Sequence, residues 1–306
     1  MIVRPRPGVF QLFTIIRGSV ITRIYPQVLA VFALSALVVW GHRAFPGLVA
    51  GFSGAPFALL GIALSVFLGF RNNACYDRWW EARKAWGQLI ATSRAFARQT
   101  LILDGTPEMP EPRRRLLTLT IAFAHALAVH LRPGHPADRV DLHLPAGVLE
   151  AFSASRNPPD MLLRRMAGEL AAIKSDGGIS DIEFRMLDDS IEQMGMVQAI
   201  CERIRHTPVP FGYTLLLHRT AYLFCLLLPF GFADVLGWAT PFSSALVAYT
   251  FFGLDALGDE LEEPFGTQPN ALPISALADM IEINLREAMG ETDLPPAPLP
   301  RDYILM

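Results

Sequence analysis

Residues 46–83 read PGLVAGFSGAPFALLGIALSVFLGFRNNACYDRWWEAR, and residues 46–70 of this stretch contain no charged side chain. A bilayer core about 30 Å thick is crossed by about 20 helical residues, so 46–70 predicts a membrane-spanning helix. The residues that follow, from Arg71 to Arg83, combine arginines with Tyr and Trp. This mixture is typical of a bilayer surface, which indicates that the helix leaves the membrane near Arg71.

Three further stretches are apolar enough to span a membrane, at residues 24–41, 209–232 and 239–257. Basic residues gather before the first span and after the second, whereas the short connections between spans contain only Arg43 or Asp234 as charged residues. The positive-inside rule therefore predicts cytoplasmic N- and C-termini and a cytoplasmic central segment. We expect a multi-pass protein of the cell inner membrane.

The composition agrees with a membrane location. Hydrophobic residues make up 52% of the 306 residues and charged residues 18%, against about 25% charged in soluble domains. The net charge of −3 offers no basic field for nucleic acid. The three cysteines lie far apart without the spacing of a disulfide framework or a metal site.

The central segment 72–206 is expected to be a helical domain, and no strand pattern or repeat is visible. Ser180 and Glu183 form an S-x-x-E capping box at the start of its last long helix, 180–205. The apolar run 116–131 is short for a span and predicts a buried core helix. The fold class is therefore all-α. We divide the chain into a cytoplasmic N-terminal segment 1–23, spans at 24–71, a cytoplasmic helical domain 72–206, spans at 207–258, and a C-terminal helix with a proline-rich tail at 259–306.

Ile62, Val66 and Phe70 recur every four residues and share one face of the second span. Copies of this helix around an axis would place three apolar rings in the middle, a constriction that gates by dewetting. An apolar stripe also suits contact with lipid, and periodicity alone does not distinguish the two. Small residues that allow close approach of helices accompany the stripe: Gly54, Ala58, Gly61, Ser65 and Gly69.

Polar residues beside the spans are further candidates. Asn72 and Asn73 directly follow Phe70, where paired amides could coordinate a dehydrated ion. His218 and Arg219 lie inside the third span, where ionisable groups are costly and often functional. The alternative is a structural pair with an acidic partner in the fourth span. That partner is Asp255 or Asp259, and the acidic end of the fourth span is expected to pair with Arg71 and Arg78.

Metal and enzyme chemistry are not indicated. His125 and His130 lie five residues apart, on different helical faces, and no HExxH pattern occurs. Cys225, His218 and Arg219 would be the reactive group of an intramembrane enzyme, but no recurring nucleophile–base spacing supports that alternative. Inverted repeats and paired broken helices, typical of secondary transporters, are also absent from the sequence.

Several separated motifs resemble one family. The segment RNNACYDRWWEARKAWG at 71–87, together with 8–27, 209–224 and EEPFG at 262–266, resembles the bacterial branch of the bestrophins. The resemblance extends over roughly residues 6–286. It implies a homopentameric channel in the lipid bilayer that conducts monovalent ions through one axial pore, with no enzymatic activity.

The resemblance also implies positions for the constrictions of the pore. A neck of three rings falls on Ile62, Val66 and Phe70, and a cytoplasmic aperture falls on Ile182. Eukaryotic members clasp calcium with an acidic run after the PFG motif, but residues 266–273 here contain no carboxylate. Since calcium takes six to eight oxygen ligands, several of them charged, no calcium cofactor is expected.

The sign of the permeant ion is the last prediction. Acidic residues near Ile182 favour monovalent cations such as Na⁺ or K⁺, because acidic rings attract cations. They are Asp176, Asp181, Asp188, Asp189 and Glu192. A solvated outer face would explain the same residues, and a chloride channel of the same architecture is the alternative.

Overall fold

The computed structural model describes residues 1–16, 18–45, 54–105, 111–132, 134, 140, 143–144 and 147–305. Over these residues the chain is helical, and its only β contacts are isolated bridges from Ile304 to Ile2 and to Arg301. The expected all-α class is confirmed for the described part of the chain. Two compact units are present: unit 1 comprises Met1–Val3, Trp80–Thr207 and Phe265–Met306, and unit 2 comprises Arg4–Trp79 and Pro208–Pro264.

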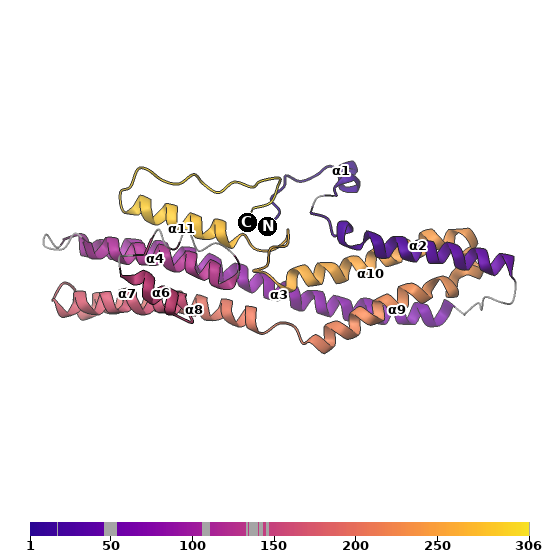
Figure 1. Cartoon of the computed structure of the whole chain (residues 1–306), viewed down its shortest axis with the longest axis horizontal. Helices are drawn as coiled ribbons and strands as arrows, with labels where there is room; N and C mark the ends of the chain where they lie inside the picture. The colour runs from indigo at the N-terminus through magenta and orange to yellow at the C-terminus, as the bar shows by residue number, and fades with distance from the viewer. Residues whose placement is uncertain are drawn as a thin grey trace. The chain divides into compact units, whose positions relative to one another are not determined.

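Unit 2 contains α1, α2, the first part of α3, α9 and α10 (Figure 1). After the short helix α1 (Val9–Thr14), α2 (Ile21–Ala44) packs against both α9 (Phe211–Leu236) and α10 (Thr240–Glu262). The first part of α3 (Gly54–Gln99) joins them through Leu64 and Leu68, which lie in the same buried cluster as Phe252. Within the described part of the chain, the helices long and apolar enough to cross a membrane are α2, α3 with its extension to Asp104, and the run Phe211–Glu262.

The run Phe211–Glu262 contains α9 and α10, separated by the 3-10 turn η2 (Gly237–Ala239). These two helices correspond to the spans expected at 209–232 and 239–257. Pro229 lies inside α9 without ending it. Of the span expected at 46–70, residues 46–53 lie outside the described part of the chain, and the rest opens α3.

Close packing of α9 against α3 depends on the absence of a side chain at Gly231. A Cβ added at Gly231 would lie 2.6 Å from the ring of Phe57, so only glycine allows this approach. At Gly61 an added Cβ would lie 3.2 Å from the ring of Phe224, whereas at Gly69 it would meet nothing within 4 Å. Of the small residues predicted to allow close helix packing, Gly61 therefore does so within one chain, whereas Gly69 does not.

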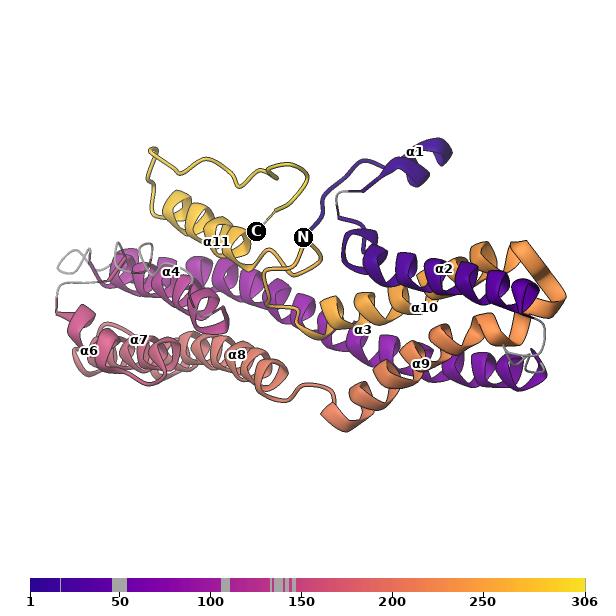
Figure 2. The same cartoon turned by 45° about the vertical axis from the view of Figure 1, so that its right-hand side comes forward.

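Unit 1 is built around α4 (Glu111–Leu131), as Figure 2 shows. This helix packs against α7 (Pro158–Ser175) and α11 (Ile274–Ala288), and α7 packs in turn on α8 (Asp181–His206). Leu116 to Leu127 of α4 are almost entirely buried inside the unit, which confirms a core helix rather than a fifth span. Among the described residues, the unit also contains the end of α3, the 3-10 helix η1 (Thr100–Gly105) and α6 (Val148–Ala154).

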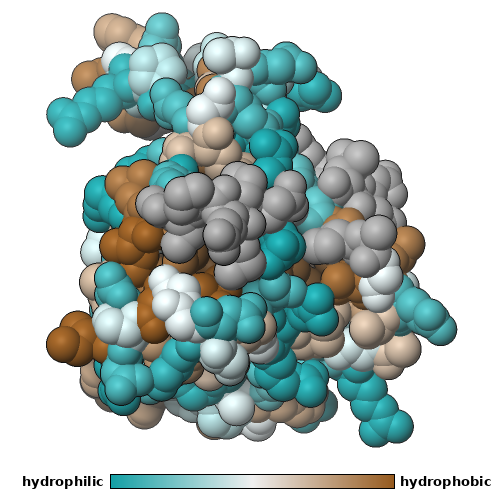
Figure 3. Space-filling view, turned by 90° about the vertical axis from the view of Figure 1, so that its left-hand side faces the viewer, coloured by the Kyte–Doolittle hydropathy of each residue, from teal (hydrophilic) through white to brown (hydrophobic). Residues whose placement is uncertain are grey.

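The start of α8 has the predicted capping box. The Ser180 hydroxyl accepts a hydrogen bond from the Glu183 amide at 3.3 Å, and the Ser180 amide donates to the Glu183 carboxylate at 2.8 Å. Gly177 turns the chain between α7 and α8 with φ +74, a conformation that favours glycine. Figure 3 views unit 1 from this end, where hydrophilic residues cover most of the face with separate apolar patches between them.

Helix α3 is longer than either segment expected from the sequence. The expected span and the expected helix from residue 72 form one continuous α-helix, Gly54–Gln99. Charged residues after Arg71 end the apolar run, but they leave the backbone hydrogen-bond ladder intact, and no proline interrupts it. The proline-rich tail at 294–300 is not helical, as expected. Beyond it, Val3 donates to the Tyr303 carbonyl at 2.8 Å and the Met1 amino group contacts the Leu305 carbonyl.

Candidate functional site

The stripe on α3 faces away from the core of unit 2. Ile62, Val66 and Phe70 are 64%, 49% and 61% exposed, whereas Leu64 and Leu68 on the same helix are 2% and 0% exposed. The two sets lie on different helical faces because successive residues turn by about 100°. Within one chain, therefore, α3 contributes Leu64 and Leu68 to the core of unit 2. The exposed stripe is available for contacts with groups outside the chain.

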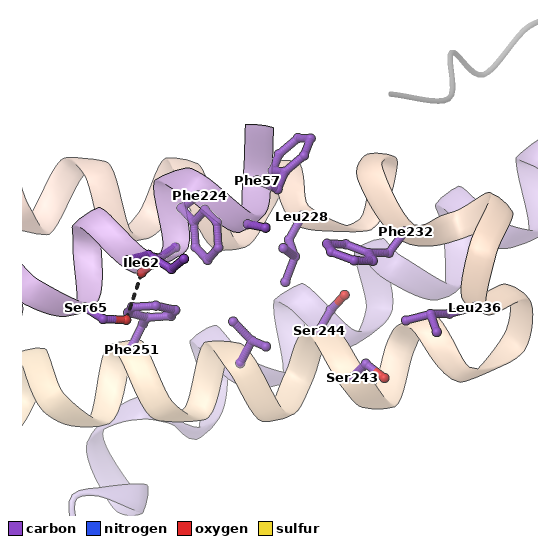
Figure 4. A pocket seen from close by; sticks show the side chains of 13 residues that line it. Phe57, Ile62, Ser65, Phe224, Leu228, Phe232, Leu236, Ser243, Ser244 and Phe251 are labelled. Carbon is purple, nitrogen blue, oxygen red and sulfur yellow. Dashed lines mark hydrogen bonds between the residues drawn. The ribbon is translucent and has the colours of Figure 1, made fainter. Parts of the chain in front are cut away.

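An apolar cavity lies beside the stripe, with a volume of about 350 Å³ (Figure 4). Ile62 lines it from α3, Phe224 and Leu228 from α9, and Phe251 from α10. The Ser65 hydroxyl donates to the Gly61 carbonyl at 2.8 Å, so it is satisfied within its own helix. Apart from Ser65, Ser243 and Ser244 the lining is apolar, suited to lipid chains or to apolar side chains of another subunit.

Directly after the stripe, Arg71 is fully buried inside unit 2. Its guanidinium contacts carboxylates of α10 at Asp255 (2.8 Å), Asp259 (2.5 Å) and Glu262 (3.3 Å). Burial of a lone charge is very costly, and opposite charges within hydrogen-bond distance offset that cost. The expected pairing of Arg71 with the acidic end of α10 is confirmed, and Arg78 joins it by donating to the Glu262 carbonyl at 3.3 Å.

His218 is the second basic partner of this cluster. Its Nδ1 lies 2.7 Å from Asp255, and its ring stacks on Tyr222 with centroids 5.4 Å apart. The structural-pair interpretation of His218 is thus confirmed, with Asp255 rather than Asp259 as the contacting carboxylate. Arg219, one residue further along α9, is exposed.

Asn72 and Asn73 do not lie side by side. Asn73 is exposed, whereas the Asn72 side-chain oxygen is buried without a hydrogen-bond partner among the described residues. A Cβ added at Gly258 would lie 2.6 Å from that oxygen, so Asn72 packs closely against α10. The pair is separated because consecutive helical residues point in different directions. Ion coordination by Asn72 and Asn73 stays a prediction.

Ile182 lies in the first turn of α8 and is 83% exposed. Two of the acidic residues near it have basic partners, since Asp181 contacts Lys174 at 2.7 Å and Asp189 contacts Arg185 at 2.7 Å. The hydrogen bond from Lys174 holds the pKa of the Asp181 carboxyl below its ordinary value. Asp188 is half-buried on the same helix.

The comparisons with known proteins agree with one another. The sequence profile described as Bacterial/Fungal Bestrophin protein matches residues 1–287. A protein of Mesorhizobium japonicum named a voltage-dependent anion channel-forming protein is 46% identical over 304 residues, covering 99% of this chain and 96% of the relative. A protein of Escherichia coli with the same description is 42% identical over 306 residues, covering 100% of both chains.

Solved structures show the same likeness in three dimensions. The crystal structure of a bacterial bestrophin homologue from Klebsiella pneumoniae superposes with a TM-score of 0.84 and 37% sequence identity. The superposition covers 89% of this chain and 100% of that one. With a family profile over most of its length and relatives well above 30% identity, this chain belongs to the bestrophins, a family of ion channels and not of enzymes.

Proposed function

We propose that this chain conducts ions through a pore made by several copies of itself, with Ile62, Val66 and Phe70 of α3 facing the axis. The observation that carries the proposal is the division of α3 into two faces. Leu64 and Leu68 are buried in the core of unit 2, whereas the stripe is 49% to 64% exposed. Truncating the stripe would therefore leave the core of each chain unchanged.

The pore architecture follows from the symmetry of such an assembly. A ring closes when each subunit uses one surface to contact a different surface of the next, and the number five comes from the family resemblance. Rings of Ile62, Val66 and Phe70 would form a neck that excludes water when narrow and conducts when wide. Ile182, exposed at the start of α8, would form the second constriction at the cytoplasmic end.

Cations are the first candidate for the permeant ion. Residues 174–192, around Ile182, contain six carboxylates and two basic side chains. The two salt bridges of Asp181 and Asp189 neutralise one carboxylate per basic group. An excess of four negative charges remains in this segment of each chain, and repeated around an axis it favours monovalent cations over anions.

Anions are the second candidate, and a specific observation favours them. The relatives from Mesorhizobium japonicum and Escherichia coli, which match almost the whole chain, are named voltage-dependent anion channel-forming proteins. Neither candidate requires a cofactor, and we propose none. The arginines around the spans support a location in the inner membrane with cytoplasmic N- and C-termini.

One recording tests both the channel and the sign of the ion. The purified full-length chain is incorporated into a planar lipid bilayer with a gradient of potassium chloride across it. We expect discrete current steps that reverse near the potassium equilibrium potential. Reversal near the chloride potential would establish the second candidate. Saturable flux without current steps, or no flux above the protein-free bilayer, would overturn the channel proposal.

The ring is tested separately by native mass spectrometry in detergent. A single species of five chains is expected. Monomers, dimers or another ring size would refute the pentamer. The proposal that the chain conducts ions is tested independently by the bilayer recording.

A further inference from the structure

Three side chains with metal-binding chemistry meet inside unit 1. His125 lies on α4, Glu282 lies on α11, and His143 follows α4 in the chain. The His125 Nε2 lies 2.9 Å from one carboxylate oxygen of Glu282, and the His143 Nε2 lies 3.4 Å from the other. The side chains of His125, Glu282 and His143 are 6%, 3% and 14% exposed, so the cluster is shielded from solvent.

We propose that His125, His143 and Glu282 bind a divalent transition-metal ion, with zinc as the best fit. Two imidazoles and one carboxylate are the donor set that zinc takes in three-ligand sites, with a water molecule as the fourth ligand. Calcium and magnesium take oxygen ligands almost exclusively, and a site with two nitrogen donors does not suit them.

The spacing of the donor atoms fits this geometry. Zinc–nitrogen and zinc–oxygen bonds of about 2.0–2.1 Å place tetrahedral ligand atoms roughly 3.3 Å apart. The two measured nitrogen–oxygen distances, 2.9 and 3.4 Å, lie on either side of that value. One ligand atom from each residue can be chosen so that all three lie within 4.8 Å of one another. Only small side-chain shifts separate this arrangement from a bound ion.

The ring nitrogen Nε2 of His143 also supports a metal ion at this cluster. The His143 Nε2 is buried and has no hydrogen-bond partner among the described residues, because its contact with Glu282 lacks hydrogen-bond geometry. Buried polar atoms are nearly always satisfied, so an exception calls for an explanation. A metal ion between His143 and Glu282 supplies the missing partner. The nearly parallel rings of His125 and His143, with 8° between their planes, present their Nε2 atoms toward the same carboxylate.

Arg286 is the group that would oppose a cation here. Its Nη1 lies 3.3 Å from Glu282, but its Nε contacts the Glu291 carboxylate at 2.7 Å and its Nη2 donates to the Asp293 carbonyl at 2.9 Å. Glu291, which also contacts Arg114 at 2.9 Å, therefore offsets part of the guanidinium charge. Its hydrogen bond to Glu282 orients the carboxylate, as partners of metal ligands commonly do.

A second group of three possible metal ligands in the described part of the chain does not fit a metal ion. His218, Asp255 and Asp259 also bring three donor atoms together. There Arg71 places its Nη1 on Asp255 and its Nη2 on Asp259, so the position between the carboxylates is occupied by a guanidinium. The cluster at Glu282 has no such group between its two histidines, and it alone of these two fits a metal ion.

Zinc binding to the purified protein tests the proposal. The full-length chain in detergent is stripped with a chelator and titrated with zinc chloride in competition with a chromophoric chelator. We expect one zinc per chain in the wild type. His143→Ala and Glu282→Gln should each lower the affinity at least tenfold. Cobalt(II) in place of zinc should give the intense visible bands of a tetrahedral site in the wild type and lose them in His143→Ala.

His130→Ala is the matched control. His130 lies on the same helix as His125 and has a carboxylate neighbour, Glu202 at 3.4 Å, but among the described residues it belongs to no trio of closely spaced metal-binding atoms. This variant should bind zinc as the wild type does. Equal zinc affinity in wild type and His143→Ala, or wild type without one tight site per chain, would overturn the proposal. Because His143 is outside α4 and α11, its variant should fold, and a wild-type melting temperature without metal would verify that.

Discussion

The Arg71 guanidinium lies 2.8 Å from the carboxylate of Asp255, and both side chains are almost fully buried. Arg71 immediately follows Phe70, the last residue of the exposed stripe. The pair joins α3 to α10, and the contact of Asp255 with His218 extends it to α9. Since Arg71 can reach Asp255 in only one rotation of α3, the pair fixes which face of α3 remains exposed.

Loss of Arg71 should destabilise the protein strongly. In Arg71→Met the buried carboxylate of Asp255 loses its guanidinium partner and keeps only the contact with His218, and breaking such a buried pair costs about 3–5 kcal/mol. Thermal unfolding in detergent, followed by circular dichroism, measures the effect. The control is Arg203→Ala, which removes an exposed contact with Glu81 and should cost about 0–1 kcal/mol. Equal melting temperatures for the two variants would contradict a structural role for the buried pair.

Truncation of the stripe should change conduction rather than stability. Ile62→Ala, Val66→Ala and Phe70→Ala together shorten side chains that face away from the core, so assembly should persist while the neck widens. Single-channel recording should show a higher conductance than the parent. A triple variant that conducts like the parent would remove these residues from the pore.

The matched control for the stripe lies on the same helix. Leu64→Ala and Leu68→Ala truncate side chains that are 2% and 0% exposed, and each should cost about 2–5 kcal/mol through the cavity it leaves. Their melting temperatures should fall while the conductance of the surviving channels stays unchanged. The opposite pattern, stable Leu variants and unstable stripe variants, would mean that α3 is rotated in the assembled protein.

Ile182→Ala should alter ion flow or selectivity with little loss of stability, because this side chain is 83% exposed and makes no core. Reversal potentials in mixed salts and melting temperatures measure the two effects. Leu187→Ala on the same helix is the control, since Leu187 is fully buried and should lower the melting temperature instead. A structure of the assembly with Ile182 pointing away from the symmetry axis would place the aperture elsewhere.

The first turn of α8 should weaken in acid. The hydrogen bonds from Ser180 hold the pKa of the Glu183 carboxyl below its ordinary value of 4.5. A depressed pKa means that the unfolded turn binds the proton more tightly, so the stabilisation is complete above pH 4.5 and is lost as the pH falls through the lowered pKa. The protection factors of the amides after Ser180, obtained from hydrogen exchange at several pH values and corrected for the intrinsic rate, should fall over that range. In Ser180→Ala this acid dependence should be reduced, and an unchanged profile would exclude the capping box as its source.

Local properties of the sequence were enough for much of the fold. The charge-free run before Arg71 predicts a spanning helix because a bilayer cannot satisfy polar groups, and α3 contains its described part. The capping box at Ser180 and Glu183 was predictable because both partners lie within one turn. The stripe of Ile62, Val66 and Phe70 follows from helical periodicity alone. Periodicity does not predict that the stripe is exposed within one chain, because the exposure depends on which face of α3 is covered by α9 and α10.

Which distant side chains meet depends on how the helices pack, and no local pattern predicts it. The sequence left Asp255 and Asp259 as alternative partners of His218. In the structure His218 contacts Asp255, and Arg71 donates hydrogen bonds to both Asp255 and Asp259. Asn72 and Asn73, adjacent in sequence, were separated by the helical turn. His125 found its partners in His143 and Glu282, the latter 157 residues away, although no spacing links them. The physical reason is that periodicity and caps depend on neighbours within a few residues, whereas buried charges and metal-binding clusters depend on helix packing, which brings together residues that share no local pattern.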